Sequence, residues 1–224
     1  QTREPGERLF RSLASALGFI WRRRGIFYIA VLAGFKNFVI NPVYILLPLL
    51  VTQHFGGGAL HLGWLQSGTG VGLIAGGLIL SAWGGFKRKV VTMHVGNALQ
   101  GLSLVMLGLT PSTLFPLAVV AMVANGTLNA FYNGPIAPLL QTAVPPDMQG
   151  RVFTLYTSIC QGGYLLSLAF VGPIVGLIGL RTWYVGGGLI VFAVCIMSLF
   201  VPSIAHLEAN VASEREAESA ASEG

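Results

Sequence analysis

Two apolar stretches of the chain carry asparagine and tyrosine at helical spacing. In each stretch the polar residues recur three or four positions apart, so they share one face of a helix. They are Asn37, Asn41 and Tyr44 in the first stretch, and Asn125, Asn129, Tyr132 and Asn133 in the second. Amides and phenols exchange hydrogen bonds but supply no strong acid, base or nucleophile. The pattern therefore indicates binding or helix pairing rather than catalysis.

These two polar stripes have two interpretations. An amide facing lipid without a partner costs several kcal/mol, so both stripes must face protein or water. Asparagine commonly joins membrane helices by hydrogen bonds. Alternatively, the stripes and their aromatic neighbours line a wet cavity for a substrate, which is the hypothesis we favour.

Lys36 is the one charge that lies deep inside an apolar stretch. It follows the start of its stretch by about ten residues, or about 15 Å of helix, near the middle of a hydrocarbon core about 30 Å thick. An ammonium at that depth should face water, a carboxylate or the substrate, and it is also a candidate proton carrier. No acid of this chain can reach it. The alternative is a lysine bonded to neighbouring helix carbonyls.

Other chemistry is missing from the sequence. It contains no Ser-His-Asp set, no His-Glu-x-x-His motif and no nucleotide-binding loop, so we expect no enzyme activity, cofactor or metal. His94 lies near the predicted cytoplasmic boundary, where we expect an ordinary hydrated histidine.

Composition defines the elements that must position these residues. Of 224 residues, 54% are hydrophobic and only 9% charged, with a mean hydropathy of +0.72, which excludes a soluble enzyme. Three long segments are almost free of charge, and each is long enough for two membrane spans. The sequence therefore predicts an all-α polytopic membrane protein with six transmembrane helices, near residues 26–52, 62–83, 90–109, 114–142, 153–176 and 183–201.

An internal repeat relates the two halves of the chain. Asn37 and Asn41 are followed by Pro42, and Asn129 and Asn133 are followed by the Gly134–Pro135 pair. The second and fifth predicted helices are both glycine-rich. Helices one to three thus resemble helices four to six, and an odd number of spans per unit inverts the second unit. Inverted three-helix repeats are typical of transporters, with the substrate pathway at their interrupted helices.

The basic residues predict the topology. All 13 lysines and arginines except Lys36 and Arg181 fall on one side of the predicted spans, which places both termini in the cytoplasm. The net charge of +5 comes from these basic residues, which set the topology in the bilayer, so we expect no nucleic-acid binding. We predict a cytoplasmic amphipathic linker over residues 1–24, a six-helix bundle over 25–202 and a disordered cytoplasmic tail over 203–224.

Three segments resemble one family of transporters. Residues 53–63 (QHFGGGALHLG), 77–89 (ending in WGGFKRK) and 144–153 (VPPDMQGRVF) resemble loops of the major facilitator superfamily. The chain resembles the C-terminal half of such a transporter, helices seven to twelve, in the macrolide-efflux-like branch. That branch also resembles siderophore exporters and lysophospholipid transporters. Trp83–Gly84 stands where the full loop signature has an Asp-Arg pair, so the acidic gating contact is expected in the other half.

The resemblance implies proton-coupled export of amphipathic, drug- or macrolide-like small molecules by alternating access in the bacterial inner membrane. The partner would be an N-terminal six-helix half, which we expect to precede Gln1. The alternatives are a siderophore or lysophospholipid transporter of the same fold, or a non-transporting membrane scaffold. The resemblance also implies a cytoplasmic gate in which charged groups form ion pairs and Gly150 allows a tight turn before the fifth predicted helix. The alternative is that these residues only set topology and cap helices. They are Lys87, Arg88, Lys89, Asp147, Gly150 and Arg151.

Overall fold

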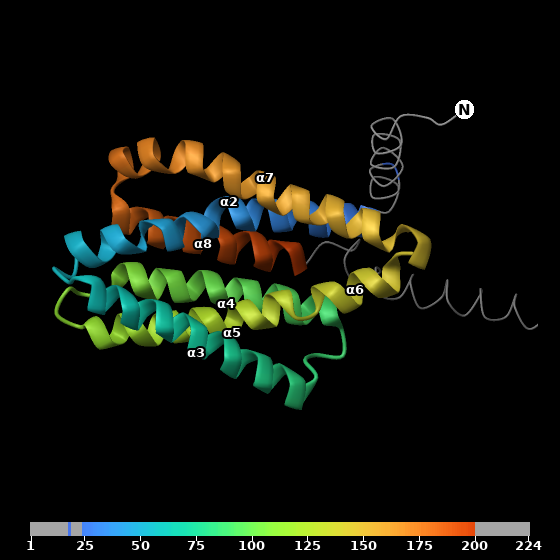
Figure 1. Ribbon diagram of the computed structural model, residues 1–224, viewed down its shortest axis with the longest axis horizontal. Helices are drawn as coiled ribbons and strands as arrows, with labels where there is room; N and C mark the ends of the chain where they lie inside the picture. The colour runs from blue at the N-terminus through green and yellow to red at the C-terminus, as the bar shows by residue number, and fades with distance from the viewer. Residues whose placement is uncertain (1–17, 19–23, 200–224) are drawn as a thin grey trace, which may run out of the picture.

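The computed structural model describes Gly18 and residues 24–199, all within or between α-helices. The predicted linker, apart from Gly18 and Arg24, and the predicted tail lie outside the described residues. The helices run in the following order: α2 (Arg24–Gln53), α3 (Ala59–Trp83), α4 (Lys89–Leu109), α5 (Phe115–Asn133), α6 (Ile136–Ala143), α7 (Pro146–Ile178) and α8 (Leu180–Leu199). Figure 1 shows them as a long bundle with their axes roughly aligned.

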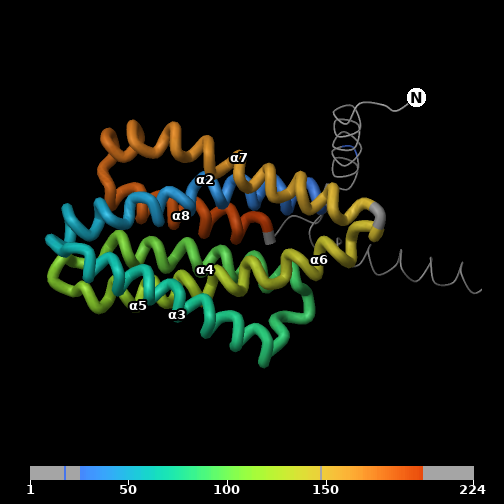
Figure 2. The backbone as a smooth tube through the Cα atoms, viewed as in Figure 1, coloured from blue at the N-terminus to red at the C-terminus, as the bar shows by residue number. Residues whose placement is uncertain are grey.

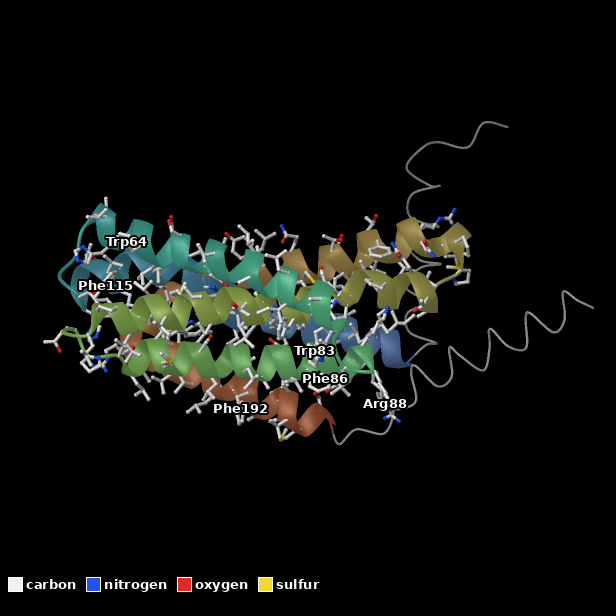
Figure 3. All side chains as sticks on the ribbon, turned by 90° about the horizontal axis from the view of Figure 1, so that it is seen from below. Trp64, Trp83, Phe86, Arg88, Phe115 and Phe192 are labelled. Atoms are coloured by element: carbon white, nitrogen blue, oxygen red, sulfur yellow. The ribbon has the colours of Figure 1, made fainter. Side chains whose placement is uncertain are left out.

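The described part contains six segments that are long and apolar enough to cross a membrane, which confirms the predicted fold class. They are Ile26–Gln53, Ala59–Trp83, Lys89–Leu109, Phe115–Ala143, Met148–Ile178 and Leu180–Ser198. The α3–α4 and α6–α7 links lie at the end of the bundle where α2 begins (Figures 1 and 2). The α2–α3, α4–α5 and α7–α8 links lie at the opposite end, and the short α5–α6 link lies between the two ends. Figure 3 accordingly shows Arg88 at one end, with Trp64 and Phe115 at the other.

The fourth predicted span agrees with the structure, whereas the start of the fifth needs correction. Phe115–Ala143 forms the fourth span, interrupted where α5 ends at Asn133 and α6 begins at Ile136. Pro135 has no N–H to continue the hydrogen-bond ladder of α5, so the ladder is interrupted there. The fifth span starts earlier than predicted: α7 begins at Pro146, since a proline fits the first helical turn, where the N–H would be unpaired anyway.

Packing between the helices repeats in an inverted manner. α3 packs mainly against α5, and α7 packs mainly against α2, while α4 pairs with α8. Exchanging α2 with α5, α3 with α7 and α4 with α8 interchanges the first two contacts and retains the third, as the predicted repeat requires. The repeat is not exact, because α4 packs against α5 more extensively than α8 packs against α2. Figure 2 shows these neighbouring tubes side by side.

Matching glycines allow the close approaches in both repeats. A Cβ added to Gly126 of α5 would overlap the Thr69 carbonyl oxygen of α3. In the other repeat, a Cβ added to Gly163 of α7 would overlap the carbonyl oxygen of Gly34 in α2. Small residues allow membrane helices to pack backbone against backbone, as α3 does against α5 and α7 against α2.

Candidate functional site

A polar cavity of about 310 Å³ lies between α2, α4, α5 and α7. This volume is at the lower end of the range for small-molecule pockets. Its walls combine amides, phenols, one ammonium and one thiol with a similar share of hydrocarbon. The lining residues are Lys36, Asn37, Ile40, Asn41, Tyr44, Gln100, Asn129, Tyr132, Asn133, Tyr156, Thr157 and Cys160.

Seven of the eight residues proposed for the cavity from sequence line this space, from both repeats. Asn125 does not line it, because it is fully buried between helices. Its Oδ1 accepts a hydrogen bond from the Tyr44 hydroxyl at 2.7 Å, and its Nδ2 donates to Ser103 Oγ at 3.1 Å. Asn125 therefore joins α2, α4 and α5 by hydrogen bonds. For this residue the helix-pairing interpretation applies instead of the cavity interpretation.

The remaining asparagines form two short ladders with matching geometry. In α2, Asn41 Nδ2 donates to Asn37 Oδ1 at 2.7 Å, and Asn37 Nδ2 donates to the Ala33 carbonyl oxygen at 2.8 Å. In α5, Asn133 Nδ2 donates to Asn129 Oδ1 at 2.6 Å. Each ladder satisfies some of its amide groups along its own helix and holds the side chains against the cavity.

Lys36 lies in the cavity wall with only 6% of its surface exposed. Its Nζ donates to Asn129 Oδ1 at 3.4 Å and lies 3.5 Å from the centre of the Tyr132 ring, a cation–π contact. The partners thus come from α5, and they replace the helix carbonyls that the alternative prediction invoked. No acidic side chain of the described part of the chain contacts the ammonium. The backbone of Asp147 lies about 13 Å along α7 from Tyr156, which is part of the cavity wall that also contains Lys36.

Sequence reasoning missed five lining residues. Ile40 is apolar, and Gln100 was hidden among other polar residues of α4. On α7, Tyr156, Thr157 and Cys160 occupy adjacent positions of one helix face, a spacing that could have revealed them. Their polarity is weak beside the amide stripes, so the spacing alone did not distinguish a cavity wall from ordinary packing.

His94 corrects another prediction. It is 1% exposed rather than hydrated, and its Nδ1 donates to the Val90 carbonyl oxygen at 2.8 Å. One turn further along α4, Asn97 Nδ2 donates to the Cys195 thiol of α8 at 3.1 Å. These residues belong to the α4–α8 contact and do not line the cavity.

The proposed gate residues all lie at the end of the bundle where α2 begins. Lys87, Arg88 and Lys89 span the exposed link into α4, and Arg151 is exposed on α7. Gly150 lies within α7 and not in a turn before that helix, so it supplies no tight turn. Asp147 falls in the first turn of α7, and its side chain lies outside the described part of the structure.

Replacing Asn125 with alanine is expected to destabilise the folded protein by about 1–2 kcal/mol. The change leaves the half-buried Tyr44 hydroxyl and the buried Ser103 without their amide partner. Thermal melting in detergent would measure the loss. Asn133→Ala is the matched control, since Asn133 is exposed and bonds only within its own helix. Equal melting temperatures for the two variants would contradict the buried linking role of Asn125.

Metal binding has no support in the described part of the chain, where no three His, Cys, Asp or Glu side chains gather. The arrangement offers hydrogen bonds and one positive charge. Six membrane-crossing helices in two inverted repeats, with a polar cavity at the interrupted helices, define a protein of the secondary-transporter class.

Residues 26–223 match the Major Facilitator Superfamily, and the chain belongs to this family. It is 25% identical over 198 residues to macrolide efflux protein A of Streptococcus pyogenes, covering 88% of this chain and 49% of that protein. The same protein from Enterococcus faecalis is 28% identical over 66% of this chain and 46% of its own length. The multidrug efflux pump Tap of Mycolicibacterium fortuitum is 24% identical, covering 66% and 36%.

The chain thus spans about half the length, or less, of these curated relatives. No solved structure matches it significantly. The six apolar segments long enough to cross a membrane agree with this family of membrane transporters.

Proposed function

We propose that this chain forms one half of a secondary active transporter that exports amphipathic, drug- or macrolide-like molecules from bacteria. Proton-coupled alternating access would drive the export. The family and the efflux relatives support the transport direction and the kind of cargo. The observation that carries the proposal is the polar cavity between the repeats. A cavity lined by amides, phenols and a lysine suits the passage of a polar group through a bilayer, whereas a scaffold needs only paired polar contacts.

The other half of the pathway would come from a second six-helix unit. Transporters of this kind bind substrate between two such units. The described residues contribute one buried cation, Lys36, and no acid inside a span. A proton-carrying carboxylate would therefore lie in the second unit, or Lys36 itself would carry the proton.

Topology and gate complete the proposal. The basic end of the bundle would face the cytoplasm of the bacterial inner membrane, with both termini on that side. There Lys87, Arg88, Lys89, Asp147 and Arg151 would form ion pairs that close the inner side, with Gly150 in the same α7 turn.

Export can be tested with the complete gene product in a drug-sensitive bacterial host. We expect cells expressing it to accumulate less radiolabelled erythromycin than vector controls, and a protonophore to abolish the difference. Unchanged accumulation of erythromycin and of a panel of lipophilic dyes, with the protein inserted in the membrane, would contradict export. Labelling of Asn129→Cys by a water-soluble maleimide separates an aqueous cavity from a scaffold, because a scaffold would leave this position unlabelled.

Replacing Arg151 with alanine is expected to lower export severalfold while insertion and abundance stay unchanged. Arg151→Lys should be milder but not silent, because lysine cannot make the planar, two-bonded contact with a carboxylate. Initial export rates, normalised to the amount of protein in the membrane, measure both effects. Equal rates for Arg151→Ala and the wild type would assign Arg151 to topology alone.

A further inference from the structure

The cavity carries a positive charge that no described anion balances. Lys36 is almost fully buried, and both of its described partners, the Asn129 amide and the Tyr132 ring, are neutral. At 3.4 Å the bond to Asn129 is long for an ammonium donor, so the Lys36 Nζ retains capacity for a stronger acceptor. The low dielectric constant around the cavity strengthens the attraction between the Lys36 ammonium and any anion that enters it.

Two further polar groups of the cavity wall are poorly paired. The Tyr132 hydroxyl is buried with the Tyr156 phenol as its one described polar neighbour, and the Tyr132 ring lies against Lys36. The Oε1 atom of Gln100 is also buried and unpaired, while its Nε2 donates to Asn125 at 3.5 Å. Buried polar atoms without partners are costly, and such atoms in a cavity wall indicate the contacts that a ligand supplies.

We propose that this cavity binds the anionic headgroup of an amphipathic cargo, a carboxylate or a phosphate ester. Lys36 supplies the charge and Tyr132 donates a hydroxyl hydrogen bond, while Gln100 Oε1 accepts a hydrogen bond from an adjacent hydroxyl or N–H of the cargo. A cationic headgroup would instead meet the like charge of Lys36 inside a poorly screened space, so a basic drug such as erythromycin has to place its amine away from this ammonium. The inference rests on the proposed transport function and specifies the substrate class for the same site.

The native thiol of Cys160 reports occupancy of the cavity, because it lines the same wall and is only half-buried. The test uses the complete protein in lipid nanodiscs with its other cysteines replaced by serine. Labelling of Cys160 by N-ethylmaleimide is timed by mass spectrometry. The probes share one chain length and differ in headgroup: dodecanoate, dodecyl phosphate and dodecyltrimethylammonium. We expect both anions to slow labelling at concentrations where the cation does not, and the better of the two to identify the headgroup.

Variants assign the effect to the site. Lys36→Met should raise the anion concentration needed for half-protection at least about tenfold, since it removes a charge-assisted hydrogen bond. Lys36→Arg should retain most of the protection. Arg181→Gln, which removes a positive charge beyond the cavity, should behave as the wild type. If Lys36→Met does not fold, Tyr132→Phe replaces it, and a severalfold weaker protection is expected.

Three outcomes overturn the inference: no protection by either anion, equal protection by all three probes, or full protection in Lys36→Met. The second outcome would indicate that the shared dodecyl chain, through binding to the membrane surface, protects the thiol whatever the headgroup. The first would favour a carboxylate of the second six-helix unit as the partner of Lys36. Export of erythromycin is measured separately, so a transporter without anion protection leaves the proposed function standing and removes only this inference.

Discussion

Replacing Gly72 with alanine is expected to prevent normal assembly of the bundle. A Cβ at this position would overlap the Val123 carbonyl oxygen and lie 3.0 Å from the Thr127 backbone nitrogen of α5. Both obstacles are backbone atoms, which cannot rotate away as a side chain can. α3 and α5 would have to separate, and the Thr127 hydroxyl would lose its 3.1 Å bond to the Gly72 carbonyl oxygen. We expect a loss of about 3 kcal/mol.

The same helix offers a matched control for this change. Gly70 is exposed, and a Cβ added there meets nothing within 4 Å. Gly70→Ala should melt at the wild-type temperature or slightly above it, because alanine favours a helix over glycine. Fluorescence-detected thermal melting of detergent-solubilised protein compares the two variants. Similar melting temperatures for Gly72→Ala and Gly70→Ala would show that α3 and α5 do not pack as closely as described.

Replacing Lys36 with methionine is expected to reduce export at least about tenfold without loss of insertion. Methionine keeps the length of the side chain and its packing but removes the ammonium from the cavity. The folded bundle should tolerate the change, since the charge has only a long amide bond and an aromatic ring as partners. One charge-assisted hydrogen bond is worth about 1.5–3 kcal/mol, which corresponds to tenfold or more in rate or affinity.

Initial rates of drug export at several pH values, normalised to membrane abundance, measure the Lys36 effect. Lys36→Arg keeps the charge and should export at an intermediate rate. A change in the pH profile of Lys36→Met would indicate that the lysine takes part in proton coupling, whereas a uniform decrease would indicate cargo binding alone. Wild-type export by Lys36→Met at every pH would make Lys36 a structural residue.

The membrane fold could be predicted from the sequence because its signals are local and strong. A charged side chain in hydrocarbon costs several kcal/mol, so membrane spans appear in the sequence as long segments without charge. Lys36 stands out because it is the one charge placed deep inside such a segment. Paired asparagines before Pro42 and before Gly134–Pro135 likewise revealed the inverted repeat. The polar faces that point inward follow from helical spacing alone.

Only the tertiary structure decided which polar residues share a space. Asn125 and Asn129 lie one turn apart on the same face of α5, yet Asn125 is enclosed by Tyr44 and Ser103 while Asn129 borders the cavity. Helical spacing gives the direction of a side chain but not the distance to the next helix. That distance depends on residues far away in the chain, such as Gly34 and Gly163, whose missing Cβ atoms let two helices touch.

The same physical reason explains the lining residues that were missed and the partners of Lys36. Gln100 and Tyr156 each lie among other polar residues of their helices, and nothing local distinguishes the ones that line a cavity from the ones buried in packing. Lys36 meets Asn129 and Tyr132 across 93 and 96 positions of sequence. Hydrophobic periodicity orients each helix separately, whereas a cavity forms only where the close packing of several helices leaves a space between them.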